Sequence, residues 1–181
     1  HKLNHHIEKI LTIAKSDYTR LQLKKELVSI VPIIEETIEN IVLKYPEAII
    51  KIETSEDYKI ETDVFHFTNL VYNLLDNAVK YSKEEVPPRI TITTFDTPTK
   101  LGVRIEDNGI GMNRETLKRV FEKFYRAHTG NIHNVKGFGL GLNYVKDIVE
   151  AHGGHVKAES VLGKGSCFTI EMPLHKGTVP A

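Results

Sequence analysis

The chain has 181 residues, of which 40% are hydrophobic and 27% charged, a composition typical of one globular domain. Its 24 basic and 24 acidic residues give a net charge of zero, which argues against nucleic acid as a partner. The single cysteine, Cys167, excludes an internal disulfide, and no apolar run approaches the length of a membrane span.

The first part of the chain predicts two helices and two strands. Residues 1–21 carry apolar residues at three- and four-residue spacing and predict a helix with one apolar stripe. The chain begins at His1, inside this pattern, so we expect it to be a piece of a longer protein. Residues 26–46 predict a short strand followed by a helix, and residues 48–55 predict a strand.

The middle of the chain predicts a helix, a hairpin and a second helix. The helix covers residues 62–82, with Thr62 or Asp63 as its N-cap. Residues 89–107 form two alternating runs around a Thr-Pro-Thr turn, which indicates a β-hairpin. The next helix begins at Asn113 and extends to residue 127.

The last part of the chain completes the predicted fold. Residues 127–136 are polar and unpatterned and predict a mobile loop, a helix follows from about 140 to 152, and residues 155–173 form a second hairpin. We therefore expect an α/β fold of the α+β type, a two-layer sandwich preceded by one extra N-terminal helix. Its mixed, mostly antiparallel sheet has about five strands, with three main helices on one face. Residues 22–176 form this domain, and residues 177–181 form a tail.

Three alternate glycines, Gly137, Gly139 and Gly141, lie where the polar loop meets a helix. Closely spaced glycines let backbone N–H groups approach an anion, and the helix directs its positive end toward it. The spacing fits neither a P-loop nor a Rossmann fingerprint. The simpler alternative is a flexible loop that ends at a helix.

A second glycine pair follows an apolar strand in "EDNGIGM", residues 106–112. Asp107 can accept a hydrogen bond from an exocyclic amine, and the glycines Gly109 and Gly111 would let a flat ring lie against the backbone. Asp-Asn-Gly is also ordinary turn chemistry, which is the alternative.

The helix with "LVYNLLDNAVKYS" has an apolar face and, opposite it, a polar face with Asn73, Asn77 and Lys80. Amide oxygens suit Mg²⁺, which usually shares its ligands with phosphates, and Lys80 could meet the phosphate charge. A solvated polar face is the alternative.

Taken in this order, the motifs resemble those of the ATP-binding domain of sensor histidine kinases, in the superfamily shared with gyrase and with chaperone and mismatch-repair ATPases. "NLLDNAVKYS" is similar to the asparagine box, "EDNGIGM" and "GFGLGL" to the two glycine boxes, and "VFEKFYRA" to the phenylalanine box. The resemblance covers residues 22–174 and implies ATP and Mg²⁺ as cofactors.

The resemblance also implies roles for individual residues. Asn77 would bind Mg²⁺, Asn73 and Lys80 would act at the reacting phosphate, and Asp107 would read the adenine amine. Thr169 resembles the strand hydroxyl near the adenine. The other nucleotide-binding residues that it implies are Tyr81, Gly109, Gly111, Tyr125, Arg126, Lys136, Gly137, Phe138, Gly139, Leu140, Gly141 and Leu142. Phe121, by contrast, is expected to be a core residue.

The phosphoacceptor of the family is absent from this chain. His1, His5 and His6 lack the acidic residue and the Arg-Thr-Pro-like sequence that follow the acceptor histidine. We interpret residues 1–21 as the C-terminal part of the dimerisation hairpin, left without the acceptor.

The resemblance predicts γ-phosphoryl transfer from Mg-ATP to a histidine on the dimerisation domain of the same, homodimeric protein, with a response regulator receiver domain downstream. An inactive nucleotide-binding signalling module and an anti-sigma-type serine kinase are the alternatives. We expect a cytoplasmic domain that does not enter the membrane, in a full-length protein anchored in the bacterial inner membrane.

Overall fold

The computed structural model describes residues 22–54, 56–123, 125 and 141–174. The helix predicted over residues 1–21, the loop over 127–136 and the tail over 177–181 lie outside the described residues.

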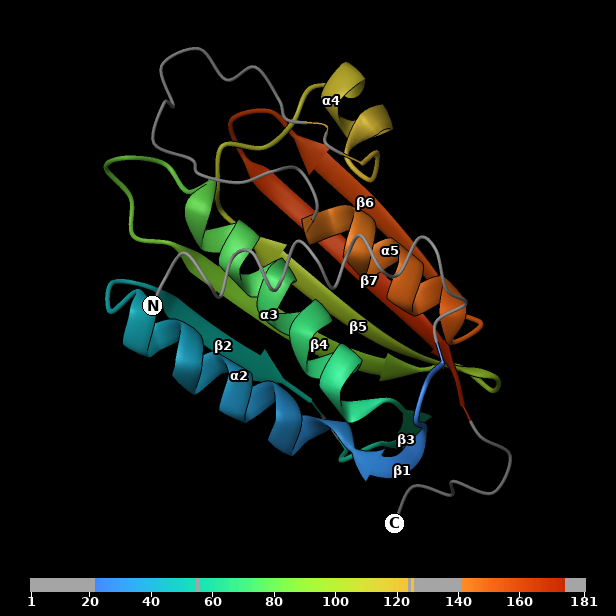
Figure 1. The fold of residues 1–181 in the computed structure, drawn as a ribbon. Coiled ribbons are helices and arrows are strands. Elements are labelled where there is room, and N and C mark those ends of the chain that lie inside the picture. The colour runs from blue at the N-terminus through green and yellow to red at the C-terminus, as the bar shows by residue number, and fades with distance from the viewer. Residues whose placement is uncertain (1–21, 55, 124, 126–140, 175–181) are drawn as a thin grey trace, which may run out of the picture.

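A five-stranded sheet forms one layer of the domain (Figure 1). Its strands, in spatial order, are β2 (Ile49–Glu53), β4 (Arg89–Asp96), β5 (Lys100–Asp107), β7 (Gly165–Pro173) and β6 (His155–Val161). β2 pairs with β4 in parallel, and the other three pairs are antiparallel. The prediction of a mixed, mostly antiparallel sheet of about five strands is confirmed.

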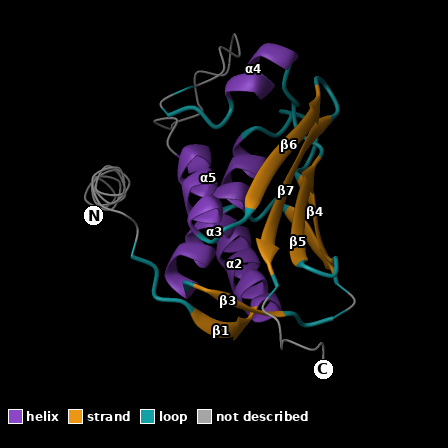
Figure 2. Cartoon of the chain, turned by 90° about the vertical axis from the view of Figure 1, so that its right-hand side faces the viewer, coloured by secondary structure: helices purple, strands orange, loops and turns teal. Residues whose placement is uncertain are grey.

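Three helices form the second layer and cover one face of the sheet (Figure 2). They are α2 (Ile30–Lys44), α3 (Val64–Lys80) and α5 (Gly141–Ala151). The core lies between the layers, where side chains such as Phe67 of α3 and Ile105 of β5 are fully buried. Apolar residues at helical spacing meet apolar residues at every second strand position, so the two periodicities produce the predicted two-layer sandwich.

The start of α3 is fixed by Asp63, one of the two expected caps. Its Oδ1 accepts a hydrogen bond from the backbone N–H of His66 at 3.1 Å, and its Oδ2 accepts one from the N–H of Lys24 at 2.9 Å. The other candidate, Thr62, is the last residue of a strand. A side-chain oxygen at the N-cap satisfies a backbone donor that the helix leaves open.

His152, at the end of α5, ties that end to the start of α3. Its Nε2 accepts a hydrogen bond from the backbone N–H of Asp63 at 3.1 Å, so its Nδ1 carries the proton and donates to the carbonyl of Ile148 at 2.8 Å. Burial lowers the pKa of His152, which keeps the ring neutral in the folded protein.

Two local features differ from the prediction. A short strand β3 (Lys59–Thr62) was missed; it pairs antiparallel with β1 (Glu26–Ser29) in a separate two-stranded sheet. The helix that begins after Asn113 is shorter than predicted, because α4 (Arg114–Arg119) ends before the chain turns. α4 buries none of its residues, so only the turn that follows it brings apolar side chains back to the core.

Within the described ranges, none of the helices combines the length and the apolar character that crossing a membrane requires.

Candidate functional site

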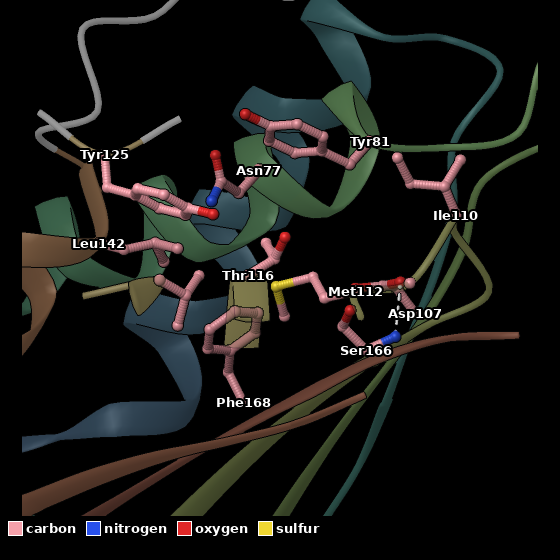
Figure 3. A pocket seen from close by; sticks show the side chains of 12 residues that line it. Asn77, Tyr81, Asp107, Ile110, Met112, Thr116, Tyr125, Leu142, Ser166 and Phe168 are labelled. Atoms are coloured by element: carbon pink, nitrogen blue, oxygen red, sulfur yellow. Dashed lines mark hydrogen bonds between the residues drawn. The ribbon is translucent and has the colours of Figure 1, made fainter. Parts of the chain in front are cut away.

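An open cleft lies between the C-terminal half of α3, the segment after β5, α4 with the turn after it, the first turn of α5 and β7 (Figure 3). It is a concave site, partly open to solvent, of the kind in which small molecules bind. Its walls are formed by Asn77, Tyr81, Asp107, Ile110, Gly111, Met112, Thr116, Val120, Tyr125, Leu142, Ser166 and Phe168.

Asp107 is the acidic residue of the cleft. Its Oδ1 accepts hydrogen bonds from the backbone N–H groups of Gly109 at 2.9 Å and Ser166 at 3.1 Å. Burial raises the pKa of the Asp107 carboxyl, and these two donors work against the increase. Within the described residues both hydrogen bonds go to Oδ1, so Oδ2 is left to accept from a ligand in the cleft.

The glycines after Asp107 make room for the chain itself. A Cβ on Gly109 would lie 2.5 Å from the carbonyl oxygen of Tyr81, and one on Gly111 would overlap the carbonyl oxygen of Val161. Gly111 also has a φ of 69°, in the left-handed region that favours glycine. The expected reason was close approach of a flat ring. The structure adds a second reason, since these glycines let the turn close against α3 and β6.

The polar stripe of α3 divides between the cleft and the interior. Asn77 lines the cleft, and among the described residues none forms a hydrogen bond with its side-chain amide. Asn73 is buried rather than solvated, and its Nδ2 donates to the carbonyl of Asn69 at 2.9 Å. A Cβ on Gly141 would lie 3.6 Å from Oδ1 of Asn73, so α5 begins beside that amide.

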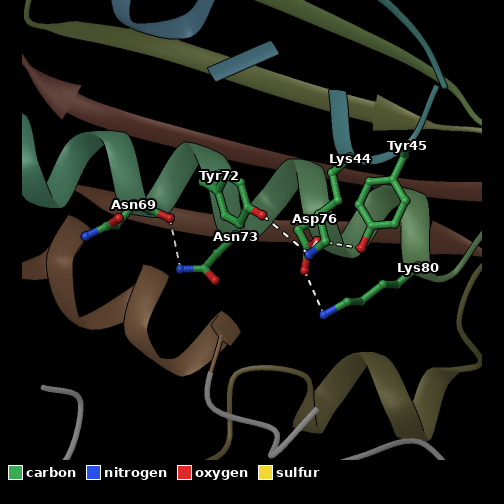
Figure 4. Close-up of polar contacts among 7 residues, drawn as sticks. All are labelled: Lys44, Tyr45, Asn69, Tyr72, Asn73, Asp76 and Lys80. Atoms are coloured by element: carbon green, nitrogen blue, oxygen red, sulfur yellow. Dashed lines mark hydrogen bonds and ion pairs between the residues drawn. The ribbon is translucent and has the colours of Figure 1, made fainter. Parts of the chain in front are cut away.

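Lys80 is not in the wall of the cleft. Its Nζ lies 2.7 Å from Oδ2 of Asp76, a carboxylate whose side chain is 8% exposed (Figure 4). Oδ1 of Asp76 accepts from the hydroxyl of Tyr45 at 2.8 Å and lies 3.2 Å from Nζ of Lys44. Sequence reasoning missed Asp76, although its position four residues before Lys80 on a helix is a recognisable ion-pair spacing.

Aromatic rings form much of the remaining wall. Tyr81 and Tyr125 both line the cleft, as expected, and the guanidinium of Arg119 lies 4.4 Å from the centre of the Tyr125 ring. Phe121 packs against the core, as predicted. Its ring lies edge-to-face on that of Phe168, with 6.1 Å between the ring centres. The turn after α4 therefore supplies a cleft residue and a core residue.

The strand hydroxyl in the cleft is that of Ser166, not that of Thr169. Thr169 is buried but is not among the cleft residues, and strand alternation places it on the opposite face from Phe168. The sequence pattern indicates this: Phe168, Ile170 and Met172 are the apolar, core-facing positions of β7, and Ser166 lies on the same face of the strand, two residues before Phe168.

Several expected residues lie outside the described residues, namely Arg126, Lys136, Gly137, Phe138, Gly139 and Leu140. Other cleft residues were not anticipated, and they are mostly apolar: Ile110, Met112, Thr116, Val120 and Phe168. Such residues look like ordinary core positions in a sequence, so no local signal separates them.

The described residues contain no group of three or more histidine, cysteine or acidic side chains that could hold a metal by itself. Asn77 offers an amide oxygen, the kind of hard ligand that suits Mg²⁺ when phosphates supply the others. The donor set therefore fits a metal that arrives with a phosphorylated ligand.

Fold and cleft together define a class: a sandwich in which the end of one helix and the turn after a central strand flank an open cleft. Residues 62–176 match the family described as "Histidine kinase-, DNA gyrase B-, and HSP90-like ATPase", and the chain belongs to this family.

Curated relatives place the chain with the sensor histidine kinases. The sensor protein RprX of Bacteroides fragilis is 43% identical over 178 residues, which cover 97% of this chain and 34% of RprX. The sensor histidine kinase WalK of Bacillus subtilis is 29% identical over 169 residues, 92% of this chain and 28% of WalK. The chain thus spans about a third of the length of these relatives.

Solved structures of histidine kinases share the fold of this chain. The catalytic domain of the histidine kinase ThkA superposes with a TM-score of 0.70 at 26% identity, over 83% of this chain and 98% of that one. Full-length ShkA shares the fold, with a TM-score of 0.85 at 22% identity over 99% of this chain and 37% of that one. The chain is accordingly a histidine-kinase-type ATPase domain, and an anti-sigma-type serine kinase is not favoured.

Proposed function

We propose that this chain binds Mg-ATP and transfers the γ-phosphoryl group to a histidine on a dimerisation domain of the same protein. The observation that carries the proposal is Asp107, whose Oδ1 is held by two backbone donors while Oδ2 has no hydrogen-bond partner in the described part of the chain. A carboxylate held in this way can accept from the exocyclic amine of adenine, and it disfavours a carbonyl at the same place.

The phosphates would extend from this base site toward the α3 stripe and the start of α5. Asn73 and Lys80 would contact the reacting phosphate, and Gly141 would present the positive end of α5 to it. Arg126, Lys136 and the residues 137–140 would complete the phosphate site. Positioning and charge neutralisation supply most of the rate in phosphoryl transfer, and these residues are of the types that provide both.

Asn77 would hold Mg²⁺ through its amide oxygen, together with phosphate oxygens and water. The ion would neutralise charge on the phosphates. Asn77 suits this role because its amide faces the cleft and has no hydrogen-bond partner among the described residues.

The acceptor and the signalling partners belong to the longer protein. We infer that the acceptor histidine lies on the dimerisation domain that precedes this chain, in a homodimer, and that a response regulator receiver domain takes the phosphoryl group. The relatives support this, because they are named sensor proteins and sensor kinases and are about three times as long. We also infer a cytoplasmic domain of a membrane-anchored kinase.

The test is incubation with γ-labelled ATP and Mg²⁺, first with the chain alone and then with a separate dimerisation hairpin that carries an acceptor histidine. We expect no label on the chain alone and acid-labile, base-stable label on the hairpin. Asn77→Ala should abolish the label, whereas Glu106→Gln, an exposed carboxylate next to Asp107 on the same strand, should retain it.

Three results would contradict the proposal in different ways. Stable phosphohistidine on the chain alone would show that one of its own histidines is an acceptor, contrary to our interpretation of residues 1–21. Acid-stable label would indicate a serine kinase. Nucleotide binding without label in either tube would indicate an inactive signalling module.

A further inference from the structure

The polar stripe of α3 contains a fourth member, Asp76, that the proposed function does not use. At about 100° per residue, Asn73, Asp76, Asn77 and Lys80 lie within an arc of about 100° on the helix. We infer that Asp76 is a positioning residue, which holds the ammonium group of Lys80 at the place where the phosphates of ATP bind; this rests on the proposed function.

Asp76 is itself held firmly by two helices (Figure 4). Its Oδ1 accepts from the hydroxyl of Tyr45, 2.8 Å away at the end of α2, and faces Nζ of Lys44 at 3.2 Å. Its Oδ2 is 2.7 Å from Nζ of Lys80. The side chain of Lys80 is 30% exposed, so a flexible lysine is restrained by a buried carboxylate that has two further partners.

The pair between Asp76 and Lys80 does more than join helices. Tyr45 and Lys44 come from α2, so their contacts with Asp76 already connect α2 to α3. Lys80 lies on α3, the same helix as Asp76, and its contact adds nothing to that connection. The contact instead holds the side chain of Lys80 in one orientation.

The charges of the cluster suit an anionic ligand. One carboxylate lies between two lysines, so the cluster carries a net charge of about +1. Burial alone would raise the pKa of Asp76, but Lys80, Tyr45 and Lys44 hold it below its usual value, so the group stays ionised. Burial, with the hydrogen bond to Asp76, raises the pKa of Tyr45 to about 12, so its hydroxyl remains a donor.

The experiment compares two ligands on the same protein by calorimetry in the presence of Mg²⁺. Adenosine occupies only the base site, whereas ATP also reaches the phosphate site. Asp76→Asn keeps an acceptor for Tyr45 but removes the charge that holds Lys80. We expect ATP to bind about tenfold more weakly, since a misplaced charge loses much of its effect, while adenosine binds within about twofold of the wild type.

A double-mutant cycle separates positioning from packing. In the Lys80→Met background, Asp76→Asn should cause little further loss of ATP affinity, because the lysine that it positions is gone. Asp96→Asn is the matched control: Asp96 also accepts from a tyrosine hydroxyl, that of Tyr58 at 3.1 Å, but it lies at the end of β4 outside the cleft. It should leave both affinities unchanged.

Tyr45→Phe provides a second variant, which carries the test if Asp76→Asn does not fold. It leaves both charges but removes one restraint on Asp76, and we expect ATP to weaken by about twofold to threefold relative to adenosine, because one hydrogen bond is lost.

Equal loss for ATP and adenosine, or a full effect of Asp76→Asn in the Lys80→Met background, would overturn the inference and leave a purely structural Asp76. The inference would also be overturned if the ratio of ATP affinity to adenosine affinity were the same as in the wild type in both Asp76→Asn and Tyr45→Phe. Failure of the proposed function gives a different result, because the wild type would then bind no ATP, or would bind it equally well after Asp107→Ala.

Discussion

Replacing Asp107 with asparagine should change which base the cleft prefers. Oδ1 of Asp107 accepts from two backbone N–H groups, those of Gly109 and Ser166. An asparagine at this position keeps both hydrogen bonds only if its own Oδ1 takes the same place. Its Nδ2 must then occupy the place of Oδ2 and present N–H donors where the carboxylate presented an acceptor.

The expected magnitude follows from this reversal. The amine of adenine would lose an acceptor and meet a donor, at a cost of about 1–3 kcal/mol, which is roughly a 5- to 150-fold weaker Kd for ATP. Inosine triphosphate carries a carbonyl in place of that amine, and the new N–H groups would suit it. Its affinity should rise, so that the preference for ATP narrows by about two orders of magnitude or reverses.

The fold should survive the change. Two hydrogen bonds to a charged acceptor become bonds to a neutral one, which costs about 1 kcal/mol each. Part of this is offset, because burial of the carboxylate already raises the pKa of Asp107 and thus penalises its ionised form. Thermal unfolding should therefore shift by only a few degrees, and binding can be compared directly.

The assay is titration calorimetry with ATP and with inosine triphosphate, on the wild type, on Asp107→Asn and on Glu106→Gln as the neighbouring carboxylate control. An equal fall in affinity for both nucleotides in Asp107→Asn would refute the reasoning. Such a result would point to a lost negative charge or a disturbed fold, neither of which distinguishes one base from another. Unchanged affinity for ATP would remove Asp107 from the base site altogether.

Three further outcomes are expected. Asn77→Ala should make ATP affinity independent of Mg²⁺ with little change in unfolding free energy, as measured by calorimetry with and without the metal; a persistent metal effect would contradict the assignment of this ligand. The pKa of His152 is lowered from 6.5 by burial, so the unfolded chain binds the proton more readily. The stability that the neutral His152 ring contributes is therefore fully present above pH 6.5 and is lost as the pH falls below it. Denaturant titrations should detect this fall in unfolding free energy with pH, and His152→Gln should remove it. Gly111→Ala should destabilise the protein by more than Gly163→Ala, because both residues have a positive φ (69° and 82°), with a strain of about 1–2 kcal/mol for alanine, but only Gly111 has a carbonyl in the place of a Cβ. Equal losses in urea unfolding would show that the backbone conformation alone requires the glycine.

Local patterns in the sequence were sufficient for the main elements and for singling out Asp107 as a candidate site residue. Apolar alternation defined the two hairpins, and helical spacing defined α2, α3 and α5. The start of α4 was placed at Asn113, which the structure shows to be its N-cap, with Oδ1 accepting from the N–H of Thr116 at 2.8 Å. Asp107 was singled out because a carboxylate after an apolar strand and before two glycines can accept from an exocyclic amine while a flat ring lies against the backbone. Each of these signals lies within a few residues of chain, which is the range over which periodicity and turn chemistry act.

Tertiary structure alone decided which distant groups meet. Tyr45 and Asp76 are 31 residues apart, and nothing in either segment shows that a hydroxyl at the end of α2 reaches a carboxylate of α3. β3 likewise becomes a strand because β1 pairs with it across the intervening helix and strand. The glycines after Asp107 depend on carbonyls of Tyr81 and Val161 that packing brings against them. Contacts of this kind arise from how the two layers pack, whereas the sequence specifies the face that each element presents to the other layer.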